Sequence, residues 1–411
     1  MLNRPHRDEV FVAGGQPTIT YVHREEEHIE KSFARAVATP NQIVSLSGPT
    51  KTGKTVLCKR ILGDRQFVWI DGGQITTAEN FWDRVAGELN IPGEVETTKG
   101  SETGVEIEGS VPLLTTASGS RLQKSETATR ARIDSMGSAL SAMLEERILL
   151  VIDDFHYLDD EVRRAVMRNV KGAVFSGLKV ILLSVTHRVF DAIKAEAELT
   201  GRFTAISLPH WSMTDLQKIP VLGFDALKVD YPAEIIAALS RESQDNPFLM
   251  QKFCWEICFD LNVDSAPLIG RSATIPKDYP LAEMMKRIST DAGLPIYRKL
   301  AAGPQSRKIR AKRPLKTGGS ADIYEVILLA LAATGPKAVV QYDELRAELS
   351  NLLQEQIPQK HEITSALKHL SRLSREGGKE AALDWDDDNR EVNLIDPYLR
   401  FYLRWQVRKA A

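Results

Sequence analysis

The sequence predicts an α/β protein in which helices sandwich a parallel sheet, followed by a helical region and a small α+β domain. Over the first half of the chain, apolar runs of strand type alternate with segments of helical period, the pattern of a parallel sheet with helical crossovers. From Trp211 onward, helical segments follow one another instead. The expected strands are residues 43–47, 67–71, 148–153, 179–185 and 204–208.

Length and composition set limits on the class of protein. At 411 residues the chain is too long for one ordinary domain, and 43% hydrophobic with 26% charged residues is typical of a globular protein. A net charge of −2 means that any nucleic-acid site must be local. Three cysteines indicate a reducing compartment rather than a disulfide framework. With no apolar signal core and no run of membrane-spanning length, we expect a cytoplasmic protein without a membrane partner.

The most specific motif is a glycine-rich loop between the first strand and a helix over 56–62. It fits the pattern G-x-x-x-x-G-K-[ST], whose backbone amides and helix N-terminus surround phosphate oxygens. Lys54 can reach the β- and γ-phosphates, and the Thr55 hydroxyl can contact Mg²⁺. The sequence therefore predicts a P-loop NTPase fold. The expected nucleotide contacts are Gly48, Pro49, Thr50, Lys51, Thr52, Gly53, Lys54, Thr55 and Val56.

The strand over 148–153 carries the second nucleotide signature, because it ends in Asp153 and Asp154. Ligands of open α/β sheets bind at the carboxyl ends of the strands. We expect Asp153 to hold Mg²⁺ and Asp154 to orient or deprotonate the attacking water, as a catalytic residue with Lys54. Alone, such a pair often only caps a helix. After a complete phosphate loop it indicates ATP hydrolysis.

Hydrophobic periodicity and the positions of glycine and proline predict the remaining elements of the core region, 21–210. Residues 1–20, with Gly14-Gly15 and Pro17, are expected to be a loosely ordered lead-in. Residues 97–129 are rich in Ser, Thr and Gly and contain one alternating stretch, 105–108, so they form an insertion, either a hairpin or an irregular surface loop. The expected helices are 29–37, 81–89, 131–145 and 189–199.

Residues 211–300 form the helical region, and in a nucleotide-binding protein such a bundle can act as a lid over the base and ribose. Its expected helices are 214–219, 233–241, 248–261 and 281–300. A linker over 301–320 follows, in which 307–316 carry six basic residues and no acid. This run is either a phosphate-contacting patch for nucleic acid or a solvated linker.

The last segment, 321–411, has the element order of a winged-helix domain. Helices are expected over 323–333, 342–353 and 362–375, and hairpin strands over 381–385 and 392–395. The third helix carries basic residues, but the hairpin tip is acidic and would repel phosphate. We therefore favour a packing or partner-binding domain. The basic residues are Lys360, Lys368, Arg372 and Arg375, and the acidic tip is 386–388.

In this order, the motifs resemble those of the AAA+/STAND class of P-loop ATPases, most closely its initiator-like and STAND branches. The phosphate loop and the acidic strand end are the specific parts of the resemblance. The matching segments are Tyr21–Glu25, Gly48–Thr55, Ile152–Leu158, Ser184–Arg188, Gly201–Phe203 and Asn246-Pro247.

The resemblance implies ATP and Mg²⁺ as cofactors and assigns three further site residues. Arg24, in the segment Tyr21–Arg24, would lie near the adenine, and Pro247 would pack beside the base. Arg202 looks like the catalytic arginine that reaches a neighbouring subunit's γ-phosphate, although it could also be a helix-capping residue. Many AAA+ motors have Glu where this chain has Asp154, so we expect slow hydrolysis.

These observations predict an ATP-dependent molecular switch that controls oligomerisation or a separate effector protein, for example in a bacterial defence or signalling system. Bound ATP would clamp the lid and the winged helix against the core. The alternative, supported by residues 307–316 and by the third helix of the C-terminal segment, is a DNA-binding initiator or transposition-regulator ATPase. A third hypothesis is a nucleotide-stabilised scaffold without meaningful turnover.

Overall fold

The structure is a computed structural model, and its described residues leave several gaps. The strand expected over 105–108, the helix expected over 189–199, most of the insertion and the start of the basic run lie outside the described residues. The described ranges are 4–24, 28–92, 94–98, 128–132, 134–185, 201–305, 310–355, 357–375 and 381–408, with only the backbone for 94–98 and 128–132.

A five-stranded parallel sheet forms the centre of the core, in the order β2-β5-β6-β1-β7. It confirms the five predicted strands to within one residue at each end. Ser47 lies opposite Ser184 and Ser207, and Asp71 lies opposite Asp153, so the carboxyl ends of the strands meet at one edge. The strands are β1 (Ile43–Ser47), β2 (Phe67–Asp71), β5 (Leu149–Asp153), β6 (Val180–Ser184) and β7 (Phe203–Ser207).

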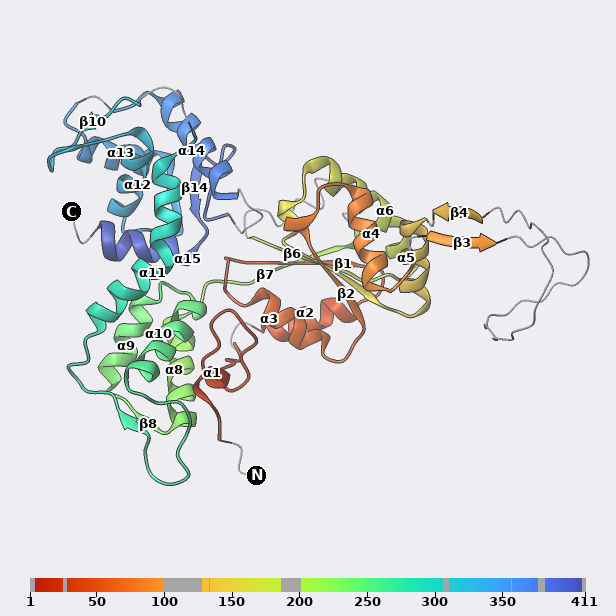
Figure 1. Ribbon diagram of the computed structural model, residues 1–411, viewed down its shortest axis with the longest axis horizontal. Helices are drawn as coiled ribbons and strands as arrows, with labels where there is room; N and C mark the ends of the chain where they lie inside the picture. Colours follow the sequence, from red (N-terminus) through yellow and green to blue (C-terminus); the bar gives the residue numbers. More distant parts are fainter. Residues whose placement is uncertain are drawn as a thin grey trace, which may run out of the picture.

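Helices cover both faces of this sheet (Figure 1). Alternate strand residues point to opposite faces, so Val44 and Leu46 pack against one helical layer and Ile43 against the other. Strands such as β5, which is apolar in its first four residues, follow from this double coverage. One layer consists of α2 (Ile29–Ala38) and α3 (Lys54–Leu62), and the other of α4 (Ala78–Glu88), α5 (Ser135–Glu145) and α6 (Asp160–Phe175).

An antiparallel strand pair extends away from the rest of the molecule beside α5 (Figure 1). It consists of β3 (Glu94–Thr98) and β4 (Ala128–Arg132), with Glu94 opposite Arg132. The helix expected from residue 131 therefore begins only at Ser135, because Ala131 and Arg132 belong to β4.

Residues 4–20 differ from the loosely ordered lead-in that the glycines and proline suggested. They contain the short helix α1 (Arg7–Val10), whose N-terminus is capped reciprocally by His6 and Glu9. Val10 and Phe11 are buried in the core of the helical region. Burial of these two apolar side chains fixes the segment.

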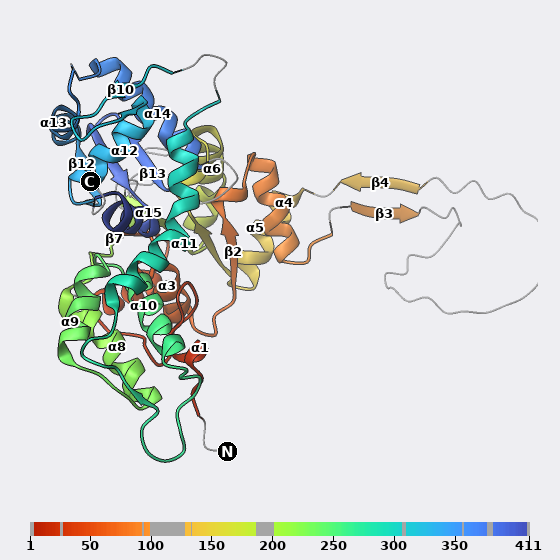
Figure 2. The same ribbon diagram turned by 60° about the vertical axis from the view of Figure 1, so that its left-hand side comes forward.

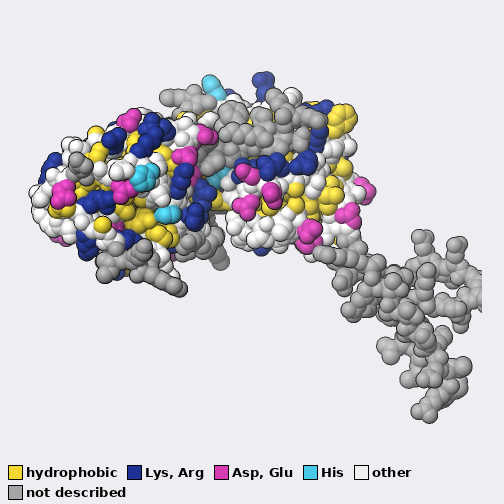
Figure 3. Space-filling model, turned by 90° about the horizontal axis from the view of Figure 1, so that it is seen from above, with side chains coloured by type: hydrophobic (Ala, Val, Ile, Leu, Met, Phe, Trp, Pro, Cys, Tyr) yellow, Lys and Arg dark blue, Asp and Glu magenta, His cyan; other side chains and the backbone are white. Residues whose placement is uncertain are grey.

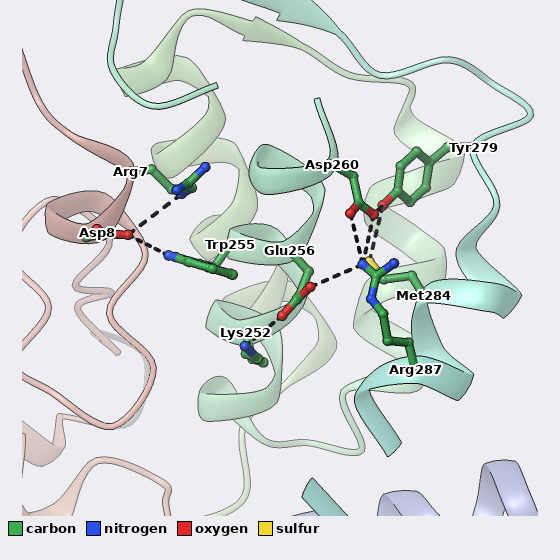
Figure 4. Close-up of polar contacts among 9 residues, drawn as sticks. All are labelled: Arg7, Asp8, Lys252, Trp255, Glu256, Asp260, Tyr279, Met284 and Arg287. Carbon is green, nitrogen blue, oxygen red and sulfur yellow. Dashed lines mark hydrogen bonds and ion pairs between the residues drawn. The ribbon is translucent and has the colours of Figure 1, made fainter. Parts of the chain in front are cut away.

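The helical region after the sheet contains four helices and one short pair of strands, β8 (Val229–Asp230) and β9 (Ala273–Thr274). Polar contacts join α10 to two other helices (Figure 4): Trp255 of α10 donates to Asp8 of α1, and Arg287 of α11 pairs with Glu256 and Asp260 of α10. The first contact joins the N-terminal residues to the helical region, and the second lies within the region. The helices are α8 (Met213–Leu227), α9 (Ala233–Glu242), α10 (Pro247–Asp260) and α11 (Leu281–Ala302).

Helix α11 runs from the helical region into the C-terminal region (Figure 2). Met284 and Ile288 lie in the core of the first, and Leu300 lies in the core of the second. Gly293 permits this bridging helix to pack closely against α15, since a Cβ there would lie 2.4 Å from the Cβ of Tyr402. Among the helices of the described ranges, none combines the length and apolar character needed to cross a bilayer.

The C-terminal region combines helices with a three-stranded antiparallel sheet in the order β12-β14-β13. Its first strand and its last helix were not predicted from the sequence. A two-stranded pair, β10 (Arg313–Pro314) and β11 (Ser320–Ala321), precedes it. The elements are α12 (Ile323–Ala333), β12 (Val339–Gln341), α13 (Tyr342–Leu352), α14 (Lys360–Arg375), β13 (Leu383–Asp386), β14 (Glu391–Leu394) and α15 (Pro397–Tyr402), which continues as a π-helix (Leu403–Val407).

Candidate functional site

The phosphate loop connects β1 to α3 at the carboxyl edge of the sheet. Gly53 precedes the helix with φ 98°, a left-handed conformation that favours glycine. Gly48 leaves room for the end of β7, because a Cβ at this position would lie 2.8 Å from the Cβ of Leu208. Both motif glycines are therefore required by the backbone geometry.

Lys54 folds back over this loop and is 9% exposed. Its Nζ donates to the carbonyl oxygens of Gly48 at 3.0 Å and Pro49 at 2.9 Å. The Thr52 hydroxyl also donates to Pro49, at 2.7 Å. The loop thus holds the ammonium group beside the backbone amides of the helix N-terminus, where an anionic phosphate is favoured.

Thr55 and Asp153 meet as the two motifs predict. The Thr55 Oγ1 donates to the Asp153 Oδ2 at 3.2 Å, and the Asp153 Oδ1 accepts from the Asp154 backbone N–H at 2.9 Å. Burial raises the pKa of Asp153, although the nearby Lys54 charge and these hydrogen bonds oppose the rise. A hydroxyl and a carboxylate fit Mg²⁺, which takes oxygen ligands and binds through one or two carboxylates together with phosphates.

Asp154 lies in the left-handed region, with φ 52°, at the start of a short 3₁₀ helix, Phe155–Tyr157. The turn after β5 brings Asp154 as well as Asp153 to the wall of a cavity. One carboxylate therefore contacts Thr55, and the second residue of the pair lines the same cavity.

This cavity has a volume of about 460 Å³ and is enclosed by four parts of the chain. The phosphate loop and the acidic pair form one side, and the helical region forms another. The N-terminal segment, residues 4–24, also contributes; the resemblance placed Tyr21–Arg24 near the base, but the part before Tyr21 was not predicted to reach the site. A signal existed in the apolar pair Val10-Phe11 before the glycines. The N-terminal lining residues include Val12, Gly14, Gln16, Pro17, Thr20 and Val22.

Arg24 and Pro247, which the resemblance assigned to the base, both line the cavity. Arg24 donates to the carbonyl oxygens of Pro209 at 3.1 Å and His210 at 3.0 Å, and its guanidinium lies 5.2 Å from the centre of the Trp211 ring. Pro247 is the first residue of α10. The structure thus brings both residues to the site.

Two side chains of the helical region contact the phosphate loop directly. The Trp211 Nε1 donates to the carbonyl oxygen of Thr52 at 3.0 Å. The Asn246 Nδ2 donates to the carbonyl oxygen of Thr50 at 3.3 Å, while its Oδ1 accepts from backbone N–H groups at the start of α10. The loop is therefore connected to α10 through one capping side chain.

Lys51 and Val56 also line the cavity, and Lys51 makes a contact that the motif did not predict. Its Nζ lies 2.7 Å from the Oδ2 of Asp396, in the C-terminal region. The phosphate loop is consequently in contact with both regions that follow the sheet.

Arg202 lies away from this cavity. It directly precedes β7, whose first residue, Phe203, lies opposite Ile43 at the amino end of β1. Its guanidinium is 4.4 Å from the centre of the Phe175 ring, at the end of α6. Arg202 is thus at the edge of the sheet opposite to the phosphate loop, and the structure does not bring it to the site of its own chain.

The basic run is largely engaged within the chain in its described part. Arg310 pairs with Asp322 at 2.9 Å, Arg313 pairs with Glu362 at 3.1 Å, and Lys316 donates to the carbonyl oxygen of Ser350. The third predicted helix is similar: Lys368 pairs with Asp387, and Arg375 pairs with Asp384. These contacts are ion pairs between α14 and the hairpin.

On the face seen in Figure 3, Lys and Arg side chains of the C-terminal region are interspersed with acidic and apolar ones. The sequence-derived alternatives for the basic run were a phosphate patch and a solvated linker. Neither describes Arg310, whose guanidinium also stacks 4.8 Å from the centre of the Tyr324 ring.

No protein-family model matches the sequence, and no curated protein is similar to it at a significant level. Solved structures are similar. A Walker-type ATPase of Pyrococcus abyssi aligns with a TM-score of 0.53 and 13% identity over 94% of this chain and 99% of that one. The ORC2 protein of Aeropyrum pernix, solved as ADPNP and ADP complexes, aligns with a TM-score of 0.50 and 14% identity over 99% and 98%. At such identity the similarity establishes the fold alone, a parallel α/β sheet flanked by helices that this chain shares with these two structures.

Proposed function

We propose that this chain, with its AAA+ fold, binds ATP with Mg²⁺ and hydrolyses it slowly as a molecular switch. The observation that carries the proposal is the cavity at the carboxyl edge of the sheet, where the phosphate loop, Lys54, Thr55 and the acidic pair meet. Its remaining walls, from the N-terminal segment and the helical region, would surround the base and ribose. Arg24 and Pro247 line that part.

The residues divide the work as follows. The loop amides and the Lys54 ammonium bind the phosphates, and the Thr55 hydroxyl and Asp153 carboxylate hold Mg²⁺. Mg²⁺, when bound, neutralises charge on the phosphate oxygens. Asp154 orients the attacking water and accepts its proton. Its side chain is one methylene shorter than Glu, so the carboxylate would lie farther from the water, which is our reason for proposing slow turnover.

Arg202 would act on a neighbouring copy of the chain. Because Arg202 lies at the far edge of the sheet, it cannot reach the cavity of its own chain but can contact the nucleotide of another subunit. We therefore propose a homo-oligomer. Mixing Arg202→Ala chains with Lys54→Ala chains tests this, because one intact composite site can form in the mixture. Activity above the sum of the two separate variants supports the proposal, and strict additivity contradicts it.

Hydrolysis itself is tested by measuring ATP turnover in the wild type, in Lys54→Ala and in Asp154→Asn. We expect Lys54→Ala to abolish turnover by removing nucleotide binding, and Asp154→Asn to bind ATP but to lower turnover at least about 100-fold, within the range for general-base catalysis. An Asp154→Asn variant with the wild-type rate would favour the scaffold hypothesis instead.

The output of the switch would be a separate effector protein, or the oligomer itself, in a defence or signalling system. The C-terminal order of helix, strand, two helices and hairpin supports the winged-helix assignment. We favour a partner-binding role because the hairpin acids neutralise Lys368 and Arg375 of α14. In the alternative, an initiator-type ATPase, the domain would bind DNA.

Salt dependence separates these two roles. A DNA-binding domain that uses phosphate contacts loses affinity steeply as salt rises. We expect no binding of a random duplex at 150 mM salt. Binding that weakens when Lys360 and Arg372 are both replaced by Ala would support the initiator reading.

A further inference from the structure

The C-terminal region reaches the phosphate loop through an ion pair that the nucleotide motif does not explain. The Lys51 Nζ and the Asp396 Oδ2 lie 2.7 Å apart, and their side chains are only 23% and 11% exposed. Lys51 adopts φ 59° in the loop, a left-handed conformation that is uncommon for a residue with a long side chain. Such a charged pair, shielded from water, interacts more strongly than an exposed one.

Three parts of the chain meet at this ammonium group. It lies 5.3 Å from the centre of the Phe248 ring at the start of α10 and 5.4 Å from that of the Tyr398 ring on α15. The two rings contact each other edge to face, with centroids 5.4 Å apart. Because Lys51 and Phe248 also line the nucleotide cavity, the contact joins the cavity wall to α15.

A second contact also joins the nucleotide-binding core to the C-terminal region. Tyr157, in the turn that follows the acidic pair, accepts a hydrogen bond from the Ala381 N–H at 2.6 Å. The Asp396 N–H donates to the carbonyl oxygen of Ala382 at 3.1 Å, so Ala381 and Asp396 lie at the same end of the β13–β14 hairpin. Both nucleotide motifs therefore contact one end of one hairpin.

We propose that Asp396 competes with the nucleotide's phosphates for Lys51, so that nucleotide binding weakens the docking of the C-terminal region on the loop. This inference rests on the proposed function of the cavity. Phosphates in the loop bring negative charge towards the Asp396 carboxylate, and both need the same ammonium group. Such coupling is reciprocal: docking lowers nucleotide affinity as much as the nucleotide lowers docking. The direction is opposite to the ATP-driven clamp expected from the sequence.

Asp396→Asn is a selective test, because Asp396 has two roles that the substitution separates. Its Oδ1 caps α15 by accepting from the Leu399 N–H at 3.0 Å, a role that Asn fills well. Only the charge towards Lys51 is lost. Asp322→Asn is the matched control. The Asp322 side chain is 12% exposed, close to the 11% of Asp396, and it also caps a helix and pairs with a basic residue, Arg310, at 2.9 Å. It contacts no nucleotide motif in the described structure.

The affinity for a fluorescent, non-hydrolysable ATP analogue with Mg²⁺ is measured by titration of the full chain. We expect Asp396→Asn to bind it about tenfold more tightly than the wild type, a typical coupling, and Asp322→Asn to bind it as the wild type does. Equal affinity in the wild type and in a folded Asp396→Asn would overturn the competition. Analogue binding that Lys54→Ala leaves intact, or no binding by the wild type, would instead refute the proposed function.

Hydrogen exchange measured by mass spectrometry reports the docking itself. In the wild type, binding of the analogue should speed amide exchange in residues 381–408. In Asp396→Asn and in Lys51→Gln, exchange in these residues should already be faster than in the wild type when no analogue is present. In the Lys51→Gln background, Asp396→Asn should add nothing further, because the partner is already gone. If neither substitution nor the analogue changes the exchange rate in residues 381–408, the proposal is overturned.

Discussion

Asn246 gives the sharpest test of how the helical region and the phosphate loop are connected. Asn246 is 5% exposed, and the two polar atoms of its side chain have different roles. The Oδ1 accepts from the N–H groups of Phe248 at 3.0 Å and Leu249 at 3.2 Å, and the Nδ2 donates to the Thr50 carbonyl oxygen at 3.3 Å. Loss of an N-cap costs about 1 kcal/mol, and loss of one buried hydrogen bond costs about 1 kcal/mol more.

Asn246→Ala should therefore lower the local stability of the start of α10 by about 2 kcal/mol, a factor of about 30 in exchange protection. Asn246→Asp keeps the capping oxygen, so this protection should stay near the wild-type value. The carboxylate, however, cannot donate to the Thr50 carbonyl oxygen and adds a negative charge beside the phosphate loop. We expect it to weaken ATP binding at least about tenfold, or about 1.4 kcal/mol, by isothermal titration calorimetry.

The two variants separate the two tasks. If Asn246→Asp binds ATP as tightly as the wild type, the contact between α10 and the loop does not influence the nucleotide. If Asn246→Ala leaves the exchange of the first turn of α10 unchanged, the capping argument is wrong. A Thr77→Ala variant, which removes the cap of α4 instead, controls for general loss of stability.

Three further substitutions test other parts of the account. Burial raises the pKa of Asp153, so the ionised carboxylate destabilises the folded chain at pH values above that pKa and has no such effect at low pH, where it is protonated. Asp153→Asn should therefore raise the melting temperature at pH 7. The same variant should lose the stabilisation by Mg²⁺-ATP, and differential scanning fluorimetry measures both effects. Gly223→Ala places a Cβ 2.2 Å from the Phe11 ring and should expose the N-terminal segment to limited proteolysis. Gly293→Ala should destabilise α15 by about 1–3 kcal/mol through its clash with Tyr402, measured as faster exchange.

The arrangement of the phosphate loop and the acidic strand end was predictable because its determinants are local or set by the topology. The loop and its helix are contiguous, so Gly48, Gly53 and Lys54 follow from one motif. The contact of Thr55 with Asp153 follows from parallel strands, whose carboxyl ends share an edge. No long-range packing had to be known.

The other walls of the site depend on packing between distant segments. The four-residue helix α1 is too short to show a helical period in the sequence. The glycines and the proline that follow it indicated a loosely ordered segment, although Phe11 is buried. The pair of Lys51 and Asp396 joins residues 345 positions apart, and neither type is unusual in its local setting. Arg202 directly precedes the last strand, so the parallel topology itself places it at the edge opposite to the phosphate loop, whereas its contact with Phe175 depends on packing. The helix α15 and the π-helix that continues it to Val407 were likewise not predicted.

ATP binding at the phosphate loop is the claim on which all the others depend. Calorimetric titration of Mg²⁺-ATP into the wild type and into Lys54→Ala tests it directly. We expect one nucleotide per chain in the wild type and loss of measurable binding in a folded Lys54→Ala. Wild-type affinity in Lys54→Ala, or no binding in either protein, would contradict the account.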